Sequence, residues 1–337
     1  MKRYLILVSL LLIFLQGCNS ENENQSEQAA EESELEPVTF VLDWTPNTNH
    51  TGVYVAQEEG YFAEEGLDVE IILPGEVGAN QLISTGKADL GISYQEGLMM
   101  ARNEDLPLVS VAAIIQHNTA GYASPVEKGI KEPADFEGKK FGGVGTELEQ
   151  VMMETILEKD DVDIETVDFI NIGEADFFTA IKRDVDFSLV YQAWTGIEAE
   201  TRNEELNMIY LKDLDEGLDF YTPIVATSEQ TIEDNPEMVE KFVKATVKGY
   251  EFAMEQPDEA ANILIESVPD INEELVHESQ KWLVDKYQAE ADEFGIQETE
   301  RWENVYEFMD ENDLIKQDFD VDQAFTNEFL PKAEEVN

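Results

Sequence analysis

Residues 38–73 read VTFVLDWTPNTNHTGVYVAQEEGYFAEEGLDVEIIL, and three elements can be recognised in them. The apolar run 38–42 predicts a strand that ends before turn-forming residues. Apolar side chains at helical spacing predict a helix over 52–62, and 69–73 is a second apolar run. A strand, a helix and a strand in this order form the unit from which parallel sheets are built. We therefore expect an α/β protein.

The same alternation continues toward the C-terminus. Thr146 and Glu149 have the spacing of a capping box, and Asn235 before Pro236 is a typical helix start. Glu149 is therefore expected to be a cap rather than a ligand contact. We predict strands at 88–93, 108–116, 140–145, 167–172, 187–190 and 224–227, and helices over 81–86, 146–156, 175–182, 235–247 and 302–309.

Two stretches of the chain resemble each other. Residues 88–95 read ADLGISYQ and residues 185–192 read VDFSLVYQ, with Asp, Tyr and Gln in the same register. This echo predicts two similar α/β lobes. The expected boundaries are 37–124 together with 223–337 for the first lobe, and 125–222 for the second.

The charge of the chain excludes several classes of protein. It has 75 Asp and Glu against 21 Lys and Arg, a formal net charge of -54. Binding nucleic acid or an anionic membrane surface needs clustered Lys and Arg, which this composition does not provide. With 42% apolar residues, the chain can still bury a sizeable core. A single cysteine rules out an internal disulfide.

The N-terminus has the organisation of an export signal. Basic residues at positions 2 and 3 precede an apolar stretch over 4–15, which is too short to span a bilayer. The following Leu15-Gln16-Gly17-Cys18 resembles the lipobox of bacterial lipoproteins, although a chance cysteine after a signal is the alternative. We expect a signal peptide at 1–17, lipidation of Cys18 and an acidic flexible tether at 18–36. The protein would then be lipid-anchored on the extracytoplasmic face of the cell membrane.

Candidate ligand-binding residues follow the predicted strands, because open α/β sheets bind ligands beyond the carboxyl ends of their strands. If a helix begins at Tyr191, then Tyr191, Trp194 and Glu198 share one face at positions i, i+3 and i+7. Aromatic rings, an amide and carboxylates would suit a flat, nitrogen-rich ring. The full candidate set is Trp44, Asn47, Tyr94, Glu96, Gly143, Gly145, Glu147, Tyr191, Trp194 and Glu198.

Structural interpretations of these residues stay open at this stage. Trp44 and Trp194 are alternatively core aromatics, Tyr94 alternatively packs at the hinge, and Glu147 is alternatively solvated. The glycine turn 142–145 could hold an anion on its backbone N–H groups. The three histidines lack metal-ligand spacing, so we predict no metal site. We also expect no catalytic residue and no cofactor.

Several strings of residues resemble the NMT1/THI5-like family: DWTPNTNHTG at 43–52, AQEEGYF at 56–62, GLDV at 66–69, GKADLG at 86–91 and GVG at 143–145. The resemblance implies a two-lobed periplasmic-binding-protein fold with a hinge and a ligand cleft between the lobes. It further implies a monomeric binding protein that delivers a thiamine pyrimidine precursor, formylaminopyrimidine or a similar aminopyrimidine, to an ABC permease and its ATPase. The WTPNTNH string is typical of the thiamine-pyrimidine branch of the family.

Two other functions are compatible with the same resemblance. One is a receptor for a different small ligand, either a sulfonate or another heteroaromatic ring. The other is a pyrimidine synthase, because His50 lies where that enzyme's motif has a histidine. The stretch corresponding to the enzyme's Cys-rich iron-binding motif reads LDFYTP at 218–223, without cysteine. No lysine lies between Thr39 and Glu59 to carry pyridoxal phosphate.

Overall fold

The computed structural model describes residues 35–173, 175–315 and 319–332. The predicted signal peptide, the lipidation site Cys18 and the tether up to Glu34 lie outside them. Strand β1 already begins at Glu36, which pairs with Leu67 and accepts a hydrogen bond from Asn235 Nδ2 at 2.6 Å. The prediction that the tether extends to residue 36 was therefore wrong. Among the described residues, no helix has both the length and the apolarity needed to cross a membrane.

Within the described residues, one sheet has five strands in the order β2-β1-β3-β10-β4. Strand β1 is parallel to β2 and β3, whereas β10 is antiparallel to β3 and β4. We call this sheet and the helices that pack on it the first lobe. The strands are β1 (Glu36–Val41), β2 (Leu67–Ile72), β3 (Leu90–Ser93), β4 (Leu108–Ala113) and β10 (Ile224–Ser228).

The second sheet repeats this pattern in the order β7-β6-β8-β5-β9, again counted over the described part of the chain. Strand β6 is parallel to β7 and β8, and β5 is antiparallel to β8 and β9. We call this sheet and its helices the second lobe. The strands are β5 (Ala120–Pro125), β6 (Lys140–Gly143), β7 (Asp168–Asn171), β8 (Phe187–Tyr191) and β9 (Leu206–Tyr210).

Strand β5 lies on the other side of the boundary from where the sequence places it. The expected boundary assigned residues 120–124 to the first lobe, yet these residues pair with β8 and β9 of the second sheet. The segment AGYASP lacks the apolar alternation of a strand, so its position depends on partners that are distant in sequence.

The echo between residues 88–95 and 185–192 corresponds to equivalent structural roles. Asp89 Oδ2 accepts from the Thr39 N–H at 2.8 Å, and Asp186 Oδ2 accepts from the Lys140 N–H at 3.0 Å. Each aspartate directly precedes a strand, β3 or β8, and binds the backbone of the neighbouring parallel strand, β1 or β6. The repeat predicted from sequence is confirmed by this symmetry and by the matching strand orders.

The helices follow the local sequence signals closely. Gly60, with φ 78°, divides the predicted helix 52–62 into α1 and α2. Thr146 and Glu149 form the predicted capping box, and the Asn235 side chain accepts from the Met238 N–H at 3.2 Å. The first-lobe helices are α1 (Thr51–Glu58), α2 (Tyr61–Glu64), α3 (Ala79–Ser84), α4 (Gln95–Asn103), α8 (Glu229–Asp234), α9 (Pro236–Glu255), α10 (Pro257–Ser267), α11 (Glu273–Tyr287) and α12 (Thr299–Glu311). Those of the second lobe are α5 (Glu147–Glu158), α6 (Phe177–Arg183) and α7 (Ile197–Thr201).

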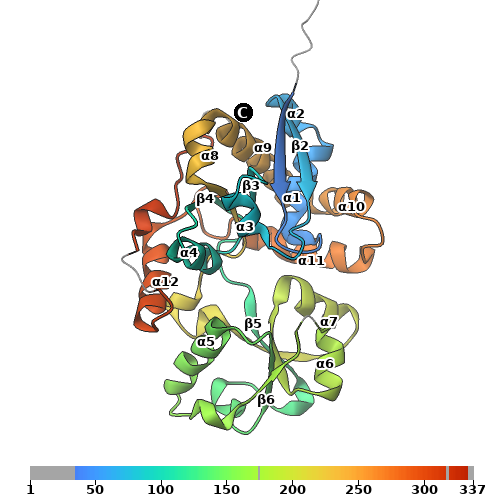
Figure 1. The fold of residues 1–337 in the computed structure, drawn as a ribbon. Helices are drawn as coiled ribbons and strands as arrows, with labels where there is room; N and C mark the ends of the chain where they lie inside the picture. The colour runs from blue at the N-terminus through green and yellow to red at the C-terminus, as the bar shows by residue number, and fades with distance from the viewer. Residues whose placement is uncertain (1–34, 174, 316–318, 333–337) are drawn as a thin grey trace, which may run out of the picture. The chain divides into compact units, whose positions relative to one another are not determined.

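Helices from the two ends of the chain pack together in the first lobe, where α9 and α10 contact α1 and α11 contacts α9 (Figure 1). Helices α1 and α9 approach closely at Gly52 and Gly249. A Cβ atom on Gly249 would lie 2.0 Å from the Gly52 carbonyl oxygen. Only glycine allows this helix–helix contact, which fixes α1 and the loop before it on the first lobe.

The chain crosses between the two sheets twice, at 114–119 and 219–223. The two crossings are hydrogen-bonded to each other: the Ile114 N–H donates to the Pro223 carbonyl at 3.0 Å, and the Asn118 N–H donates to the Asp219 carboxylate at 2.9 Å. They therefore form one connected unit rather than two independent linkers.

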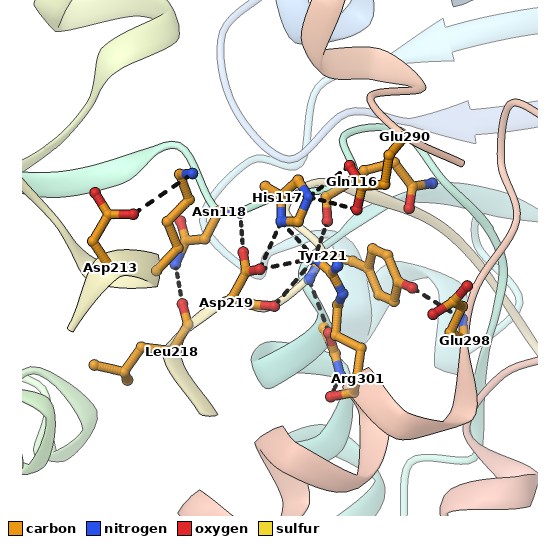
Figure 2. Close-up of polar contacts among 12 residues, drawn as sticks. Gln116, His117, Asn118, Asp213, Leu218, Asp219, Tyr221, Glu290, Glu298 and Arg301 are labelled. Carbon is orange, nitrogen blue, oxygen red and sulfur yellow. Dashed lines mark hydrogen bonds and ion pairs between the residues drawn. The ribbon is translucent and has the colours of Figure 1, made fainter. Parts of the chain in front are cut away.

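A cluster of charged side chains reinforces this unit (Figure 2). Asp219 lies 2.6 Å from His117 Nδ1 and 3.2 Å from the Arg301 guanidinium, and Glu290 lies 2.9 Å from His117 Nε2. The hydrogen bond to Asp219 raises the pKa of His117 above its ordinary value, against an opposing effect of burial. The crossings are thereby fastened to α12 and to the segment after α11.

Candidate ligand site

The loop after β1 presents Trp44 and Asn47. Trp44 is 52% exposed, which places it at the surface rather than in the core. The Asn47 side chain builds the loop itself, since Oδ1 accepts from the Asn49 N–H at 2.9 Å and Nδ2 donates to the Thr45 carbonyl at 3.1 Å. The local sequence thus folds into an Asn-capped turn that leaves an indole ring free to contact a ligand.

Asp43 ties this loop to the start of α4. Its Oδ1 lies 2.7 Å from His50 Nε2, and its Oδ2 accepts a hydrogen bond from the Tyr94 hydroxyl. Burial alone would raise the pKa of Asp43, but the charge and hydrogen bonds of these partners outweigh it and lower the pKa. The Tyr94 hydroxyl is therefore used for support, and so is the His50 ring, whose Nδ1 accepts from the Asn47 N–H at 3.2 Å.

Glu96 lies in the first turn of α4 and is unusual among the carboxylates. Its Oε2 is buried without a hydrogen-bond partner among the described residues. Burial raises its pKa to about 8, although backbone N–H groups of Glu96 and Gly97 act in the opposite direction. Burial also raises the pKa of Tyr191, and the charges of Glu96 and Asp43 add to this effect. These charges from the first lobe therefore act on a tyrosine of the second lobe.

The glycine turn after β6 is occupied by the protein's own carboxylate. Glu149 accepts from the N–H groups of Val144 at 3.0 Å and Gly145 at 2.8 Å. The backbone donors that an external anion would need are thereby satisfied. Gly145 adopts φ +83°, and Glu147 is exposed at the start of α5.

A cavity of about 330 Å³ opens in the second lobe at the carboxyl ends of β6 and β8. It brings together four of the residues proposed from sequence: Gly143, Tyr191, Trp194 and Glu198. Gly145 and Glu147 do not line it, nor do the four first-lobe candidates. Four of the six second-lobe candidates therefore line one concavity, and its walls include aromatic and acidic side chains.

The helix expected to begin at Tyr191 has a different form. A π-turn over Gln192–Gly196 precedes α7, so the predicted α-helical spacing of i, i+3 and i+7 was wrong. The wide turn accommodates the Gln192 amide against Gly196, where a Cβ atom would lie 2.1 Å from Gln192 Oε1. Tyr191, Trp194 and Glu198 nevertheless line the same cavity.

Glu198 is paired with Arg202, the C-cap residue of its own helix. Its Oε1 accepts from the Arg202 guanidinium, which also stacks 4.0 Å above the centre of the Phe178 ring. The carboxylate is oriented by this contact and still lines the cavity.

Sequence reasoning did not single out Phe177 and Phe178, which line the cavity from the start of α6. Asp176 N-caps this helix through the Thr179 N–H at 2.9 Å. An Asp-Phe-Phe triplet at 176–178, in the connection that follows the strand at 168–171, was the available signal, because helix caps after strands mark the same edge of the sheet.

The arrangement of two similar α/β lobes joined by two crossings is that of periplasmic binding proteins. A solved alkanesulfonate-binding protein from Xanthomonas axonopodis pv. citri superimposes with a TM-score of 0.66 at 12% identity, covering 87% of this chain and 99% of that one. This likeness establishes the fold.

The family follows from sequence. The model described as NMT1/THI5 like matches residues 47–260, and the chain belongs to this family. A formylaminopyrimidine-binding protein from Halalkalibacterium halodurans is 32% identical over 95% of this chain and 98% of its own length. A 4-amino-5-hydroxymethyl-2-methylpyrimidine phosphate synthase from Legionella pneumophila is 25% identical, with coverages of 87% and 92%.

Proposed function

We propose that this chain is an extracytoplasmic binding lipoprotein, anchored through Cys18, that captures a thiamine pyrimidine precursor for an ABC permease and its ATPase. The ligand would be formylaminopyrimidine or a similar aminopyrimidine. The observation that carries the proposal is the aromatic and acidic cavity at Tyr191, Trp194 and Glu198. The 32% identity with a formylaminopyrimidine-binding protein supports it.

The chemistry of this cavity suits a flat ring that carries hydrogen-bond donors. Stacking on an aromatic side chain contributes about 0.5–1.5 kcal/mol beyond area burial. Glu198 can accept from an exocyclic amine as a charge-assisted hydrogen bond. The cavity volume of about 330 Å³ lies within the usual range for small-ligand sites.

The first lobe would complete the site when the lobes close about the crossings. Trp44 offers a second aromatic plate. Glu96, with its pKa of about 8, is mostly protonated at pH 7 and can donate as well as accept. An aminopyrimidine edge presents a donor next to an acceptor, which a neutral carboxyl group complements. In this proposal Asn47 and Tyr94 position the loop, and the molecule acts as a monomer.

The alternative ligand class fits the cavity less well. A sulfonate would meet the carboxylates of Glu149, Asp176 and Glu198, all of which line the cavity. Like charges in a partly buried site repel, so an anion is disfavoured there. The nearby Arg202 is already paired with Glu198.

The residues of this chain argue against the enzymatic alternative. The single cysteine of the chain is Cys18, so residues 218–223 contribute no thiolate ligand. Both ring nitrogens of His50 are engaged, by Asn47 and Asp43. These features favour a receptor over a pyrimidine synthase.

Isothermal titration of the purified chain tests the proposal directly. Formylaminopyrimidine, or the corresponding aminomethyl or hydroxymethyl pyrimidine, should bind with micromolar or tighter affinity and quench tryptophan fluorescence. Taurine and nitrate should not bind. Mass spectrometry of small molecules retained through a native purification provides an unbiased control. Tight sulfonate binding without a pyrimidine response would overturn the ligand assignment, and turnover of a pyrimidine would overturn the receptor assignment.

A further inference from the structure

Ser279 on α11 connects the two halves of the candidate site. Its Oγ lies 2.5 Å from Thr48 Oγ1, in the turn that follows Trp44, and it also donates to the carbonyl of Ala193. Ser279 is fully buried, and Thr48 and Ala193 are 1% exposed. One hydroxyl therefore joins the first-lobe loop to the π-turn of the second lobe, away from solvent.

The direction of this chain of hydrogen bonds follows from the donor inventory. A serine hydroxyl has one proton to donate and two lone pairs to accept with. Because the Ala193 carbonyl can only accept a hydrogen bond, the Ser279 hydroxyl donates its single proton to that carbonyl. Thr48 must then be the donor to Ser279. The order Thr48 to Ser279 to Ala193 is thereby fixed, and loss of the middle hydroxyl would leave both ends without these partners.

Thr48, the first-lobe residue in this series of hydrogen bonds, lies in a loop that buried tyrosines hold in place. The Tyr287 hydroxyl donates to the Thr48 carbonyl at 2.8 Å, and the Tyr250 hydroxyl donates to the Asn49 carbonyl at 2.6 Å. Both tyrosines are fully buried. These hydrogen bonds fix the loop to α9 and α11. The loop therefore gives Ser279 a fixed position from which it binds Ala193.

The second-lobe end carries a proposed ligand contact. Ala193 belongs to the main hydrophobic cluster of the first lobe, and the next residue, Trp194, packs against the same cluster. Helix α11 contacts both the π-turn and α7. The position of the Trp194 ring in the cavity therefore depends on how the π-turn is seated on the first lobe.

We propose that Ser279 is a positioning residue of the ligand site. Through the hydrogen bonds to Thr48 and Ala193 it sets the turn bearing Trp194 relative to the loop bearing Trp44. This inference rests on the proposed binding function, because the role of Ser279 would be to preorganise the ligand site. A site whose two segments are already in position loses less conformational freedom when the ligand binds.

Ser279→Ala is the test, since it removes the hydroxyl without adding volume. Ser267→Ala is the matched control, because Ser267 donates to the Ile263 carbonyl at 2.7 Å within its own helix. In the ligand-free protein, amide hydrogen exchange should become faster in residues 43–50 and 192–198 of Ser279→Ala only. Affinity for formylaminopyrimidine should fall about three- to tenfold in this variant, as expected for one lost hydrogen bond.

The two measurements separate the two proposals. If the parent does not bind a pyrimidine, the proposed function fails, while exchange in the ligand-free variant still decides whether Ser279 positions the turn. A uniform increase in exchange over the whole chain would indicate a general loss of stability and would overturn the inference. Exchange and affinity equal to those of Ser267→Ala would overturn it as well. A Thr48→Val variant should show the same localised pattern more weakly, because Ser279 keeps its bond to Ala193.

Discussion

Trp44, Glu96 and Glu198 are three of the proposed ligand contacts, and their environments differ. Trp44 is 52% exposed, whereas Glu96 has a buried carboxyl oxygen without a partner and Glu198 pairs with Arg202. Each environment gives a distinct expectation for a substitution, because burial governs stability and contact with the ligand governs affinity.

Trp44→Ala should reduce affinity more than stability. The ligand would lose a stacking surface, while the fold would lose little buried area. The free energy of unfolding should fall by much less than the roughly 3–5 kcal/mol typical of core tryptophan truncation. Thermal melts and calorimetric titration measure the two effects. If the variant binds the ligand with the parent's affinity, Trp44 is not part of the ligand site.

Glu198→Gln keeps the shape of the side chain and removes its charge. Affinity for an aminopyrimidine should fall by about 1–2 kcal/mol, since a charge-assisted hydrogen bond becomes a neutral one. Glu158→Gln on the exposed end of α5 is the matched control. Equal affinities for the two variants in calorimetric titration would show that Glu198 does not contact the ligand.

Glu96→Gln should change the pH dependence of stability. Because burial raises the folded-state pKa of Glu96 from 4.5 to about 8, its contribution to stability is present below pH 4.5 and is lost as the pH rises through 8. The variant cannot ionise, so it should melt at a higher temperature than the parent at pH 9 and at a similar one near pH 4. Melting curves from pH 4 to pH 9 check the sign of the difference in melting temperature between the variant and the parent. A constant difference between the two proteins would contradict it.

At the scale of elements, close packing between α1 and α9 supports the loop after β1. The hydroxyls of Tyr250 and Tyr287 reach this loop from α9 and α11. The geometry of the proposed ligand site is therefore set partly by helices that begin 192 and 229 residues after Trp44 in the chain.

Gly249→Ala should disrupt this packing. The added Cβ would lie 2.0 Å from a backbone oxygen that cannot move independently, so the helices must separate. We expect a loss of about 1–3 kcal/mol in the free energy of unfolding, despite the higher helix propensity of alanine. Gly97→Ala in α4 is the control, because the nearest atom to its Cβ is 3.7 Å away. Urea denaturation should show the control at or above the parent's stability; equal values for both variants would contradict the packing argument.

For the whole molecule, a net charge of -54 creates strong self-repulsion that salt can screen. An acidic surface of this kind is consistent with an environment that is salty or alkaline. The proposed attachment to the membrane relies on the lipid at Cys18 and not on basic residues, which would be needed to attract anionic lipids.

Cys18→Ala should abolish membrane retention in cells while leaving ligand affinity unchanged. The acyl chain would be the anchor, whereas the proposed ligand contacts all lie beyond the start of β1 at Glu36. Fractionation into membrane and soluble pools, together with metabolic labelling by a fatty acid, measures the effect. Deletion of residues 19–34 in the parent should leave both lipidation and binding intact. Equal membrane partition of Cys18→Ala and the parent would contradict the lipoprotein proposal.

The sequence by itself determined most elements and their class. The periodicity of apolar residues and the helix caps are local signals. They therefore predicted, within a few residues, strands β1, β2, β3 and β8 and the starts of α5 and α9. The repeated Asp-Tyr-Gln register predicted the two lobes because the same local contacts recur in each. The positions of Trp44 and Tyr191 near strand ends followed from the general rule for open sheets. Trp194 and Glu198 lie in the turn and the helix that come next.

Tertiary structure decided what depends on partners distant in sequence. Strand β5 belongs to the second sheet only through pairing with β8 and β9, and the π-turn after Tyr191 accepts a hydrogen bond from Ser279 of α11. Asp43 binds Tyr94 51 residues away, and Ser279 meets Thr48 231 residues away. Such hydrogen bonds leave no periodic trace in the sequence, since their energy arises only when burial removes the competing water.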